Sequence, residues 1–308
     1  MKYFFILVIV ISGKMVVAQD PYFSQYNFSK IFTNPAYAGS DSTFNFNIAK
    51  RYQRPAVAGG YNTMAFATDN YFRFLKGGLG ATILHENQMN GVYSSTDITV
   101  MYAPHFELFT HKMVLKPAIQ IGYFRRNWDF EKLYFGDQID ERKGFMYKTI
   151  EVQKLEAKTG VDLSTGFVIY TDKFYGGMAL HHLTEPDEGE MTTSRIPIKI
   201  TLNAGINFNI DKIVIITPTI LYLRQQDFQL LLPGVTAAYK FINVGFGYSF
   251  SNILMMSVGM HNRLFKLSYA FDYARSALTN TEGGSHELQL AWLMHHKRVC
   301  KIKTIPIR

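Results

Sequence analysis

Histidine groups are the first residues of this sequence whose types and spacing could serve a metal ion. They are His105 with Glu107 and His111, the pair His181-His182, and the pair His295-His296. Adjacent residues on a β-strand point to opposite faces, so neither pair can chelate an ion from one side. The first group lacks the spacing of a helical His-Glu-x-x-His zinc site and falls at a predicted turn. We therefore predict no metal site.

Serine and histidine neighbours raise the question of a hydrolase. The hints are Ser285-His286 and the pair Ser94-Ser95 near His85. A Gly-x-Ser-x-Gly turn is missing, and no third residue at a recognisable distance would orient the histidine. Gly77-Gly78-x-Gly80 falls at a strand start, where glycine eases a tight turn, and is not a nucleotide loop. The sequence thus predicts neither an enzyme nor a cofactor.

Carboxylates gather in two connecting segments. Residues 184–191 carry Glu185, Asp187, Glu188 and Glu190. A calcium site is one interpretation, but the spacing matches no calcium motif and favours a solvated charged loop. The longest connection carries Asp129, Glu131, Asp137, Asp140, Glu141 and Arg142 among Trp128, Phe130, Tyr134 and Phe135. Aromatic and charged residues together suit contact with another protein better than paired-carboxylate catalysis.

In the segments between these groups, apolar and polar side chains alternate with a period of two residues. Between Ile196 and Asn209 apolar side chains hold every second position, with polar or small residues between them, and Arg263–Tyr273 repeats the pattern. Such strands present one apolar and one polar face. A soluble β-sandwich also alternates, but its strands are about 5–6 residues long. Membrane strands run to about 9–11 residues, and the segments here are of the longer kind.

The pattern predicts an all-β fold, a transmembrane outer-membrane antiparallel β-barrel of about 14 strands within residues 43–296. The predicted strands are 43–51, 62–71, 77–88, 92–106, 112–124, 159–170, 173–183, 196–209, 212–223, 226–239, 241–250, 253–261, 263–273 and 286–296. If both termini are periplasmic, the even-numbered connections are short turns. The long connections, 52–61, 125–158, 183–195 and 274–285, are then all external, which is typical of a barrel.

The N-terminus has the features of a secretory signal peptide over residues 1–18. Lys2 precedes the apolar run 3–11, and small residues precede a cleavage site after Ala18. Aromatic residues make up 15% of the chain and charged residues 18%, below the usual quarter for charge. Removing Lys2 and Lys14 from a formal net charge of +8 leaves about +6. This excess forms no nucleic-acid-like stripe, so we expect no nucleic-acid partner.

Two terminal segments flank the predicted barrel. Residues 19–42 are rich in aromatic and amide residues and include two prolines, which disfavours a regular strand. We predict that this segment packs inside the barrel or across its periplasmic mouth as a plug; the alternative is a mobile leader. Residues 297–308 hold Lys297, Arg298, Lys301, Lys303 and Arg308, together with the single cysteine, Cys300. We expect this basic tail to face periplasmic machinery.

Collinear motifs give the sequence a family resemblance. They are Gln19-Asp20-Pro21-x-Phe23-Ser24-Gln25, Asn34-Pro35-Ala36-x-Ala38-Gly39, Phe135-Gly136-Asp137-Gln138, Phe174-Tyr175-Gly176-Gly177, His182-Leu183-x-x-Pro186, Asp272-x-x-x-Ser276-x-Leu278 and Ser285-His286-Glu287-x-x-Leu290. The set resembles the PorP/SprF family, outer-membrane components of the type IX secretion system of Bacteroidetes. The resemblance covers nearly the whole chain after residue 18.

The resemblance implies an integral outer-membrane barrel that supports secretion or surface attachment of partner proteins. These include adhesins with a C-terminal sorting domain, and some relatives serve gliding motility. It implies no catalytic residues, so the motif residues are expected to be structural or partner-contacting. They are Asn34, Pro35, Ala36, Gly39, Gly136, Asp137, Gln138, His182, Pro186, Asp272, Ser276 and His286. The expected partners are exported adhesins, other secretion-system components and outer-membrane lipid. The alternatives are a passive or hydrophobic-solute porin and a secreted β-sandwich adhesin.

Overall fold

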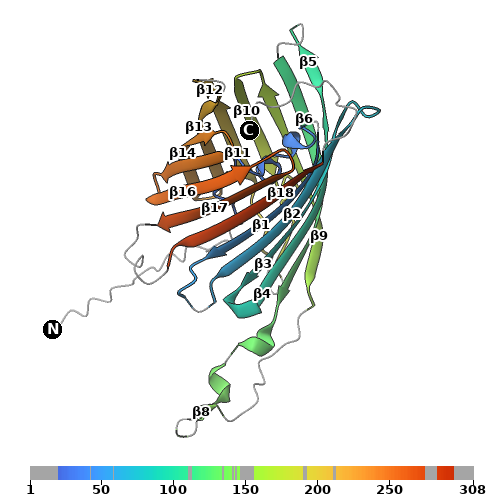
Figure 1. Ribbon diagram of the computed structural model, residues 1–308. Helices are drawn as coiled ribbons and strands as arrows, with labels where there is room; N and C mark the ends of the chain where they lie inside the picture. Colours follow the sequence, from blue (N-terminus) through green and yellow to red (C-terminus); the bar gives the residue numbers. More distant parts are fainter. Residues whose placement is uncertain are drawn as a thin grey trace, which may run out of the picture.

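A closed antiparallel β-barrel of fourteen spanning strands forms the body of the molecule (Figure 1). The computed structural model describes residues 20–41, 43–57, 59–109, 113–133, 135–140, 142, 144–145, 156–189, 193–210, 213–274 and 283–294. Each spanning strand pairs with the next along the chain, and the first pairs with the last, so no spanning strand is left at an edge. Closure satisfies the backbone hydrogen bonds of every strand, as a lipid environment requires.

The spanning strands agree one for one with the predicted strands, and only their ends differ. They are β1 (Phe44–Gln53), β2 (Tyr61–Phe72), β3 (Gly77–Gln88), β4 (Tyr93–Pro104), β6 (Met113–Trp128), β9 (Lys158–Tyr170), β10 (Phe174–His181), β11 (Lys199–Ile206), β13 (Val214–Gln225), β14 (Phe228–Tyr239), β15 (Ile242–Ser249), β16 (Ile253–His261), β17 (Phe265–Ala274) and β18 (Ser285–Met294). The prediction of about 14 strands is confirmed.

Short elements lie outside this set. β5 (Phe106–Leu108) pairs with β6, β12 (Phe208–Asn209) pairs with β13, and β7 (Ile139–Asp140) pairs with β8 (Gly144–Phe145). The 3₁₀ turns are η1 (Lys30–Phe32), η2 (Pro35–Tyr37), η3 (Met89–Gly91), η4 (Phe130–Lys132) and η5 (Gly136–Gln138). Among the described residues, no helix is long and apolar enough to cross a membrane.

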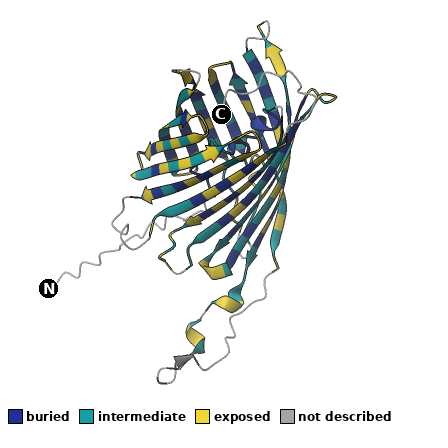
Figure 2. Cartoon of the chain, in the orientation of Figure 1, coloured by how far each residue is buried: buried dark blue, intermediate teal, exposed yellow. Residues whose placement is uncertain are grey.

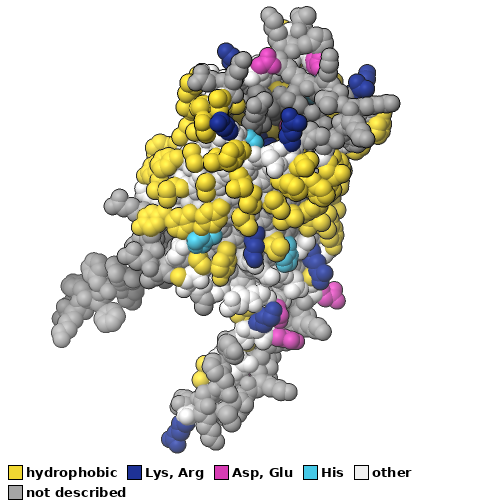
Figure 3. All heavy atoms as spheres, in the orientation of Figure 1, with side chains coloured by type: hydrophobic (Ala, Val, Ile, Leu, Met, Phe, Trp, Pro, Cys, Tyr) yellow, Lys and Arg dark blue, Asp and Glu magenta, His cyan; other side chains and the backbone are white. Residues whose placement is uncertain are grey.

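Alternating burial shows which parity faces outward. In β17, Ser268, Ala270 and Asp272 are buried, whereas Leu267 and Tyr269 are exposed. Figure 2 shows this alternation along strand after strand, and Figure 3 shows the exposed apolar side chains as a broad belt around the visible face. The predicted arrangement, an apolar outer face around a polar interior, is therefore present.

The connections sort by length as predicted, with two qualifications. The strand ends joined by the long connections 129–157 and 182–198 lie at one end of the barrel, here called the loop side. The strand ends joined by 54–60, 89–92, 226–227, 250–252 and 275–284 lie at the same end. The opposite end, the turn side, has the connections 73–76, 105–112, 171–173, 207–213, 240–241 and 262–264. On the turn side, 105–112 and 207–213 are longer because they contain β5 and β12, and three loop-side connections are also short.

Residues 20–41, here called the N-terminal segment, lie in the lumen and contact several parts of the barrel wall. Glu287 on β18 accepts hydrogen bonds from the backbone nitrogens of Ser24 and Gln25, at 2.8 and 3.0 Å. The Tyr26 hydroxyl lies 2.8 Å from the Thr219 hydroxyl on β13. Because four other strands separate β18 from β13 along the shorter way round the barrel, the segment bridges across the interior.

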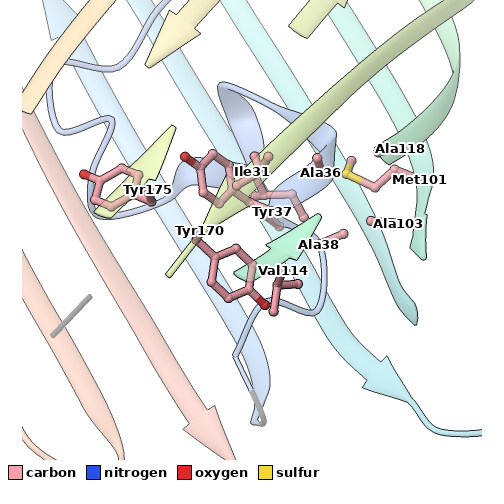
Figure 4. Packing of buried hydrophobic residues seen from close by; sticks show 12 residues of the cluster. Ile31, Ala36, Tyr37, Ala38, Met101, Ala103, Val114, Ala118, Tyr170 and Tyr175 are labelled. Carbon is pink, nitrogen blue, oxygen red and sulfur yellow. The ribbon is translucent and has the colours of Figure 1, made fainter. Parts of the chain in front are cut away.

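Apolar packing fixes the middle of the N-terminal segment (Figure 4). Ile31 and Tyr37 are buried in a cluster with Val114 on β6 and with Tyr170 and Tyr175 on β9 and β10. Aromatic rings bury a large apolar area while a hydroxyl group can still find a polar partner. The Tyr37 hydroxyl does so by bonding to the side-chain amide of Asn203. The aromatic residues that made this segment unusual in sequence are therefore core residues of the lumen.

A buried charge cluster joins the segment to the seam between the first and last strands. Arg51 on β1 lies 2.7 Å from Asp272 and 2.9 Å from Glu287, and all three side chains are almost completely buried. Ser24 hydrogen-bonds to Asp272 and to Arg51. Arg51 and Glu287 are also direct cross-strand partners in the seam. The same guanidinium therefore holds the two ends of the sheet and the N-terminal segment together.

Two glycines allow the segment to touch the wall on the turn side. Gly39 has a φ of +59°, which favours glycine, and its nitrogen donates to the Asp69 carboxylate at 2.7 Å. A methyl group on Gly78 would collide with the carbonyl of Ala38 and with the Cα of Gly39. Backbone therefore packs directly against backbone at this point.

We expect the substitution Arg51→Met to lower the free energy of unfolding by about 3–5 kcal/mol, because it leaves two buried carboxylates without their cation. Urea unfolding of the detergent-solubilised protein measures the loss. The control is Lys50→Gln, since Lys50 is the neighbouring residue on the exposed face and a surface change is typically within about 0.5 kcal/mol. Equal losses in both variants would contradict the role given to the buried cluster.

We expect Gly78→Ala to displace the N-terminal segment, because the added methyl group meets backbone atoms that cannot rotate away. Hydrogen exchange of residues 20–41 should become faster, while exchange in β15 stays unchanged. Gly136→Ala is the matched control, since no atom lies within 4 Å of its added methyl group. Unchanged exchange in the Gly78 variant would show that the close approach is not needed for seating.

Candidate functional site

A cavity of about 580 Å³ lies between the N-terminal segment and the barrel wall. Its wall residues come from β3, β4, β6, β9, β10, β11 and β13, and its floor includes Phe23, Phe32 and Thr33 of the segment. Glu86, Asp97 and Arg126 lie near the strand ends that lead to loop-side connections. The cavity is therefore on the loop side of the segment. A second cavity, of about 70 Å³, borders the segment elsewhere, at Lys30, Asp41 and Lys266.

Arg126 organises one side of the cavity rim. Its guanidinium lies 2.9 Å from Asp97 on β4 and 3.1 Å from Glu188 in the connection 182–198. It also stacks over the ring of Phe124, with 5.1 Å between the guanidinium carbon and the ring centroid. Asp187, next to Glu188, pairs with Lys158 at 2.9 Å. The acidic segment 184–191, predicted as a solvated loop, is thus tied to the barrel through its two described pairs.

Asp20 begins the N-terminal segment and anchors it to the other side of the rim. Its carboxylate lies 2.7 Å from Nε2 of His182 and 2.8 Å from Nζ of Lys199, and Nδ1 of His182 lies 2.9 Å from Asp162. Burial alone would lower the pKa of His182, but the two carboxylates outweigh burial and raise that pKa to about 10. Burial opposes ionisation of Asp20 too, yet Lys199 and His182 hold the pKa of Asp20 well below its usual value. Asp20 and His182 therefore stabilise each other as an ion pair at neutral pH. We call Asp20 with its partners His182 and Lys199 the Asp20 latch.

Chemically, the cavity combines an acid-rich polar wall with an aromatic one. Its charged lining comprises the carboxylates Asp20, Glu86, Asp97, Asp162 and Glu188 and the basic groups Arg126, His182 and Lys199. The aromatic lining includes Tyr93, Trp128 and Phe130, with ring centroids of Tyr93 and Trp128 4.7 Å apart and those of Trp128 and Phe130 6.2 Å apart. Such a surface suits binding of polypeptide side chains more than bond cleavage.

The residues considered for catalysis do not form a reactive group. Ser95 is buried in the lumen lining, whereas His85 lies on the opposite parity and bonds to Thr96 at 2.9 Å. His286 is on the outer face, 2.7 Å from the hydroxyl of Tyr269. Across the described ranges, no group of three His, Cys, Asp or Glu side chains is arranged so that it could hold a metal ion. His111, His295 and His296 lie outside the described residues.

One argument about the histidines was wrong for His181-His182. We expected adjacent residues to face opposite sides of the wall, but both of these line the cavity. His181 ends β10 and lies 3.2 Å from the Thr33 carbonyl oxygen. His182 follows the strand with a φ of +60°, so strand alternation no longer applies to it. Its turn back into the lumen is what allows the contact with Asp20.

The structure brings several predicted site residues to the N-terminal segment. Asn34 is fully buried, and its side-chain amide donates to the carbonyls of Phe167 and Met178, both at 3.1 Å. Its side-chain oxygen accepts from the nitrogen of Ala36 at 2.9 Å, and this caps η2, in which Pro35 is the first residue. With Gly39, His182 and Asp272 described above, these motif residues all support the segment.

Other predicted site residues lie apart from the cavity. Gly136, Asp137 and Gln138 form η5 in the long connection 129–157, and the carbonyl of Pro186 accepts from the nitrogen of Ile196 at 3.0 Å. His286 faces outward, and Ser276 lies outside the described residues. The motifs thus do not form one site: six of the twelve residues belong to the N-terminal segment or hold it, and the other described ones lie in connections or on the outer wall.

Sequence reasoning did not select Arg51, Glu287, Lys199 or Arg126 as site residues. Arg51, Glu287 and Lys199 are charged residues on the inward parity of predicted strands, whereas Arg126 fell in the predicted connection 125–158. Inward parity on a predicted strand indicates that a charged side chain faces the lumen. It does not identify the partner, because the pairs Arg51–Glu287 and Lys199–Asp20 join residues far apart in sequence.

Solved structures with a similar fold are outer-membrane proteins. The Ralstonia pickettii toluene transporter TbuX aligns with a TM-score of 0.50 at 11% identity, covering 85% of this chain and 91% of that chain. The Acinetobacter baumannii outer membrane protein Omp33 aligns at 0.46 and 9% identity, covering 83% and 99%. A Pseudomonas aeruginosa FadL homologue aligns at 0.43 and 10% identity, covering 82% and 89%. At these identities the likeness shows the fold alone.

A comparison with curated protein sequences found no match. The sequence model of the family described as type IX secretion system membrane protein PorP/SprF matches residues 16–292, nearly the whole chain. The resemblance carried by the motifs is thereby confirmed. The chain therefore belongs to the PorP/SprF family of type IX secretion system membrane proteins, and it is a β-barrel of the outer membrane.

Proposed function

We propose that this protein supports the secretion or cell-surface attachment of partner proteins, and that it does so as a barrel that does not conduct solutes. The observation that carries the proposal is the N-terminal segment, which occupies the lumen and is fixed at the seam, in the middle and at the loop-side rim. A pore needs an open lumen, whereas a partner-binding protein needs a rigid surface. The filled lumen favours the second role.

The contact surface for an exported partner is the loop side. The connections 129–157, 182–198 and 275–284 lie at this end, and the cavity rim with Trp128, Phe130 and Arg126 lies beneath them. Aromatic residues and arginine are enriched in protein interfaces. Exported adhesins with a C-terminal sorting domain, including adhesins used in gliding, are the partners that family membership suggests.

The remaining parts of the chain have proposed roles in assembly. Residues 1–18 direct export and are removed after Ala18, and residues 297–308 contact other secretion-system components in the periplasm. Charge supports the second role, because Lys297, Arg298, Lys301, Lys303 and Arg308 have no acidic residue among them. The protein acts without a cofactor and without enzymatic activity in this proposal.

A porin for hydrophobic solutes is the second candidate. The cavity is large enough for a small molecule, and part of its wall is aromatic and apolar. Conductance separates the two functions. We expect the purified protein in planar bilayers to show no large steady current, since the N-terminal segment fills the lumen. Deletion of residues 20–39 should produce one. A large steady current from the intact protein would support the porin and contradict the proposed non-conducting barrel.

We expect deletion of the gene to reduce surface display of exported adhesins and cell adhesion. Expression of the intact protein should restore both. The variant Gly78→Ala should restore them less well if seating of the N-terminal segment shapes the loop side. Lys173→Gln, a change of an exposed residue on the turn side, is the control. Immunolabelling of intact cells measures display. Normal display and adhesion in the deletion strain would show that the protein is not needed for this step.

A further inference from the structure

On the described spanning strands, the outward face carries basic but no acidic side chains, whereas the inward face carries both, for example Arg51 with Glu287. The carboxylates of the described spanning strands all face inward: Asp69, Glu86, Asp272 and Glu287 are buried, and Asp97 and Asp162 line the cavity. The outward parity carries basic side chains instead, at Lys50, His85, Arg125, Arg224 and His286. Each of these lies toward the loop-side end of its strand.

Three of the outward basic residues share one cross-strand row. Lys50 pairs with Met64, Met64 with His85, His85 with Thr96, and Thr96 with Arg125. Direct cross-strand partners have side chains on the same face, and Lys50 and Arg125 are exposed. We call Lys50, His85, Thr96 and Arg125 the basic row. Strands lie about 4.8 Å apart, so successive basic side chains along the row are about 10 Å apart.

The rows on either side differ sharply in polarity. The next row toward the turn side is Ile48, Phe66, Ile83, Ile98 and Tyr123. The next row toward the loop side is Tyr52, Asn62, Asn87, Ser94 and Asn127. The basic row is thus the transition from the apolar belt to a polar surface. Figure 3 shows histidine and lysine or arginine side chains along the lower border of the apolar belt, on the loop side.

A basic side chain on the lipid face is costly unless it lies near the interface, since Lys or Arg at the midplane costs about 2–4 kcal/mol. Near the interface it can meet anionic headgroups, and an attraction of about 1 kcal/mol per basic residue is typical. Among the described spanning strands no outward carboxylate neutralises the row from within the wall. Anionic headgroups of the surrounding leaflet are suited to supply this counter-charge.

We propose that the basic row binds the phosphate groups of a phosphorylated glycolipid in the outer leaflet. Lys50 and Arg125 supply charge-assisted hydrogen bonds to phosphate oxygens. His85 and Thr96 lie between them and add polar hydrogen-bonding groups. The asparagines, serine and tyrosine of the loop-side row contact sugar hydroxyls, and the acyl chains lie on the apolar row. The site faces lipid and is independent of the partner-binding role proposed for the loop side.

The test measures binding of purified lipid A to the full-length protein. Protein purified from outer membranes and stripped of lipid in detergent is mixed with lipid A, and bound lipid is counted by native mass spectrometry. We expect Lys50→Gln with Arg125→Gln to weaken binding about tenfold or more, since two charge-assisted contacts are lost. Arg224→Gln with Lys173→Gln removes the same charge elsewhere and should bind as the unaltered protein does.

Further arms separate the competing explanations. Heat-modifiable migration on gels tests whether each variant forms a closed barrel. If the double variant does not fold, Arg125→Lys replaces it in the test; this variant keeps the charge and should retain most lipid binding. Excess inorganic phosphate should displace little lipid A; ready displacement would mean an anion site and overturn the glycolipid proposal. Equal lipid binding by the two double variants, or an acidic protein bound to the row in place of lipid, would also overturn it.

Discussion

The buried contact of Arg51 with Asp272 and Glu287 is the interaction on which the rest of this structure depends. It crosses the seam where β1 meets β18, and the two carboxylates also bind Ser24 and Gln25 of the N-terminal segment. A buried cation next to two carboxylates is stable only when every member is paired and hydrogen-bonded. Closure of the barrel brings Arg51 next to Asp272 and Glu287, and the N-terminal segment supplies the hydrogen-bond donors of Ser24 and Gln25 to the same two carboxylates. Barrel closure and binding of the segment therefore stabilise each other.

The position of the N-terminal segment determines whether the lumen of this barrel is open or occupied. A closed wall with a polar interior is equally compatible with a channel, and the fold shared with the toluene transporter TbuX does not separate these roles. The segment fills the lumen from the Asp20 latch at the loop side to the Gly39–Gly78 contact at the turn side. The cavity that remains lies on the loop side and has an aromatic and charged rim, and this is the surface that the proposed role in secretion uses.

Much of the fold could be predicted because its signal is local. Side chains alternate along every spanning strand, so the sequence around Phe265–Tyr273 or Ile196–Asn209 shows its two faces without any knowledge of neighbours. Strand ends were less predictable, because pairing with a neighbouring strand sets them. The predicted strand 112–124 stops short of Trp128, where β6 ends opposite Tyr93 of β4. His181-His182 shows the same limit: alternation holds for His181 and fails one residue later, where the strand has ended.

By itself, the sequence determined the class of fold, the even strand number, the sorting of connections and the family, because each follows from period, length or an ordered set of motifs. It also marked the N-terminal segment as unsuited to regular strand. Only the tertiary structure decided where that segment lies, which wall charges hold it, and which outward basic residues share a row. These depend on cross-strand register and on pairs such as Asp20 with Lys199, and contacts between residues so distant in sequence leave no local pattern to read.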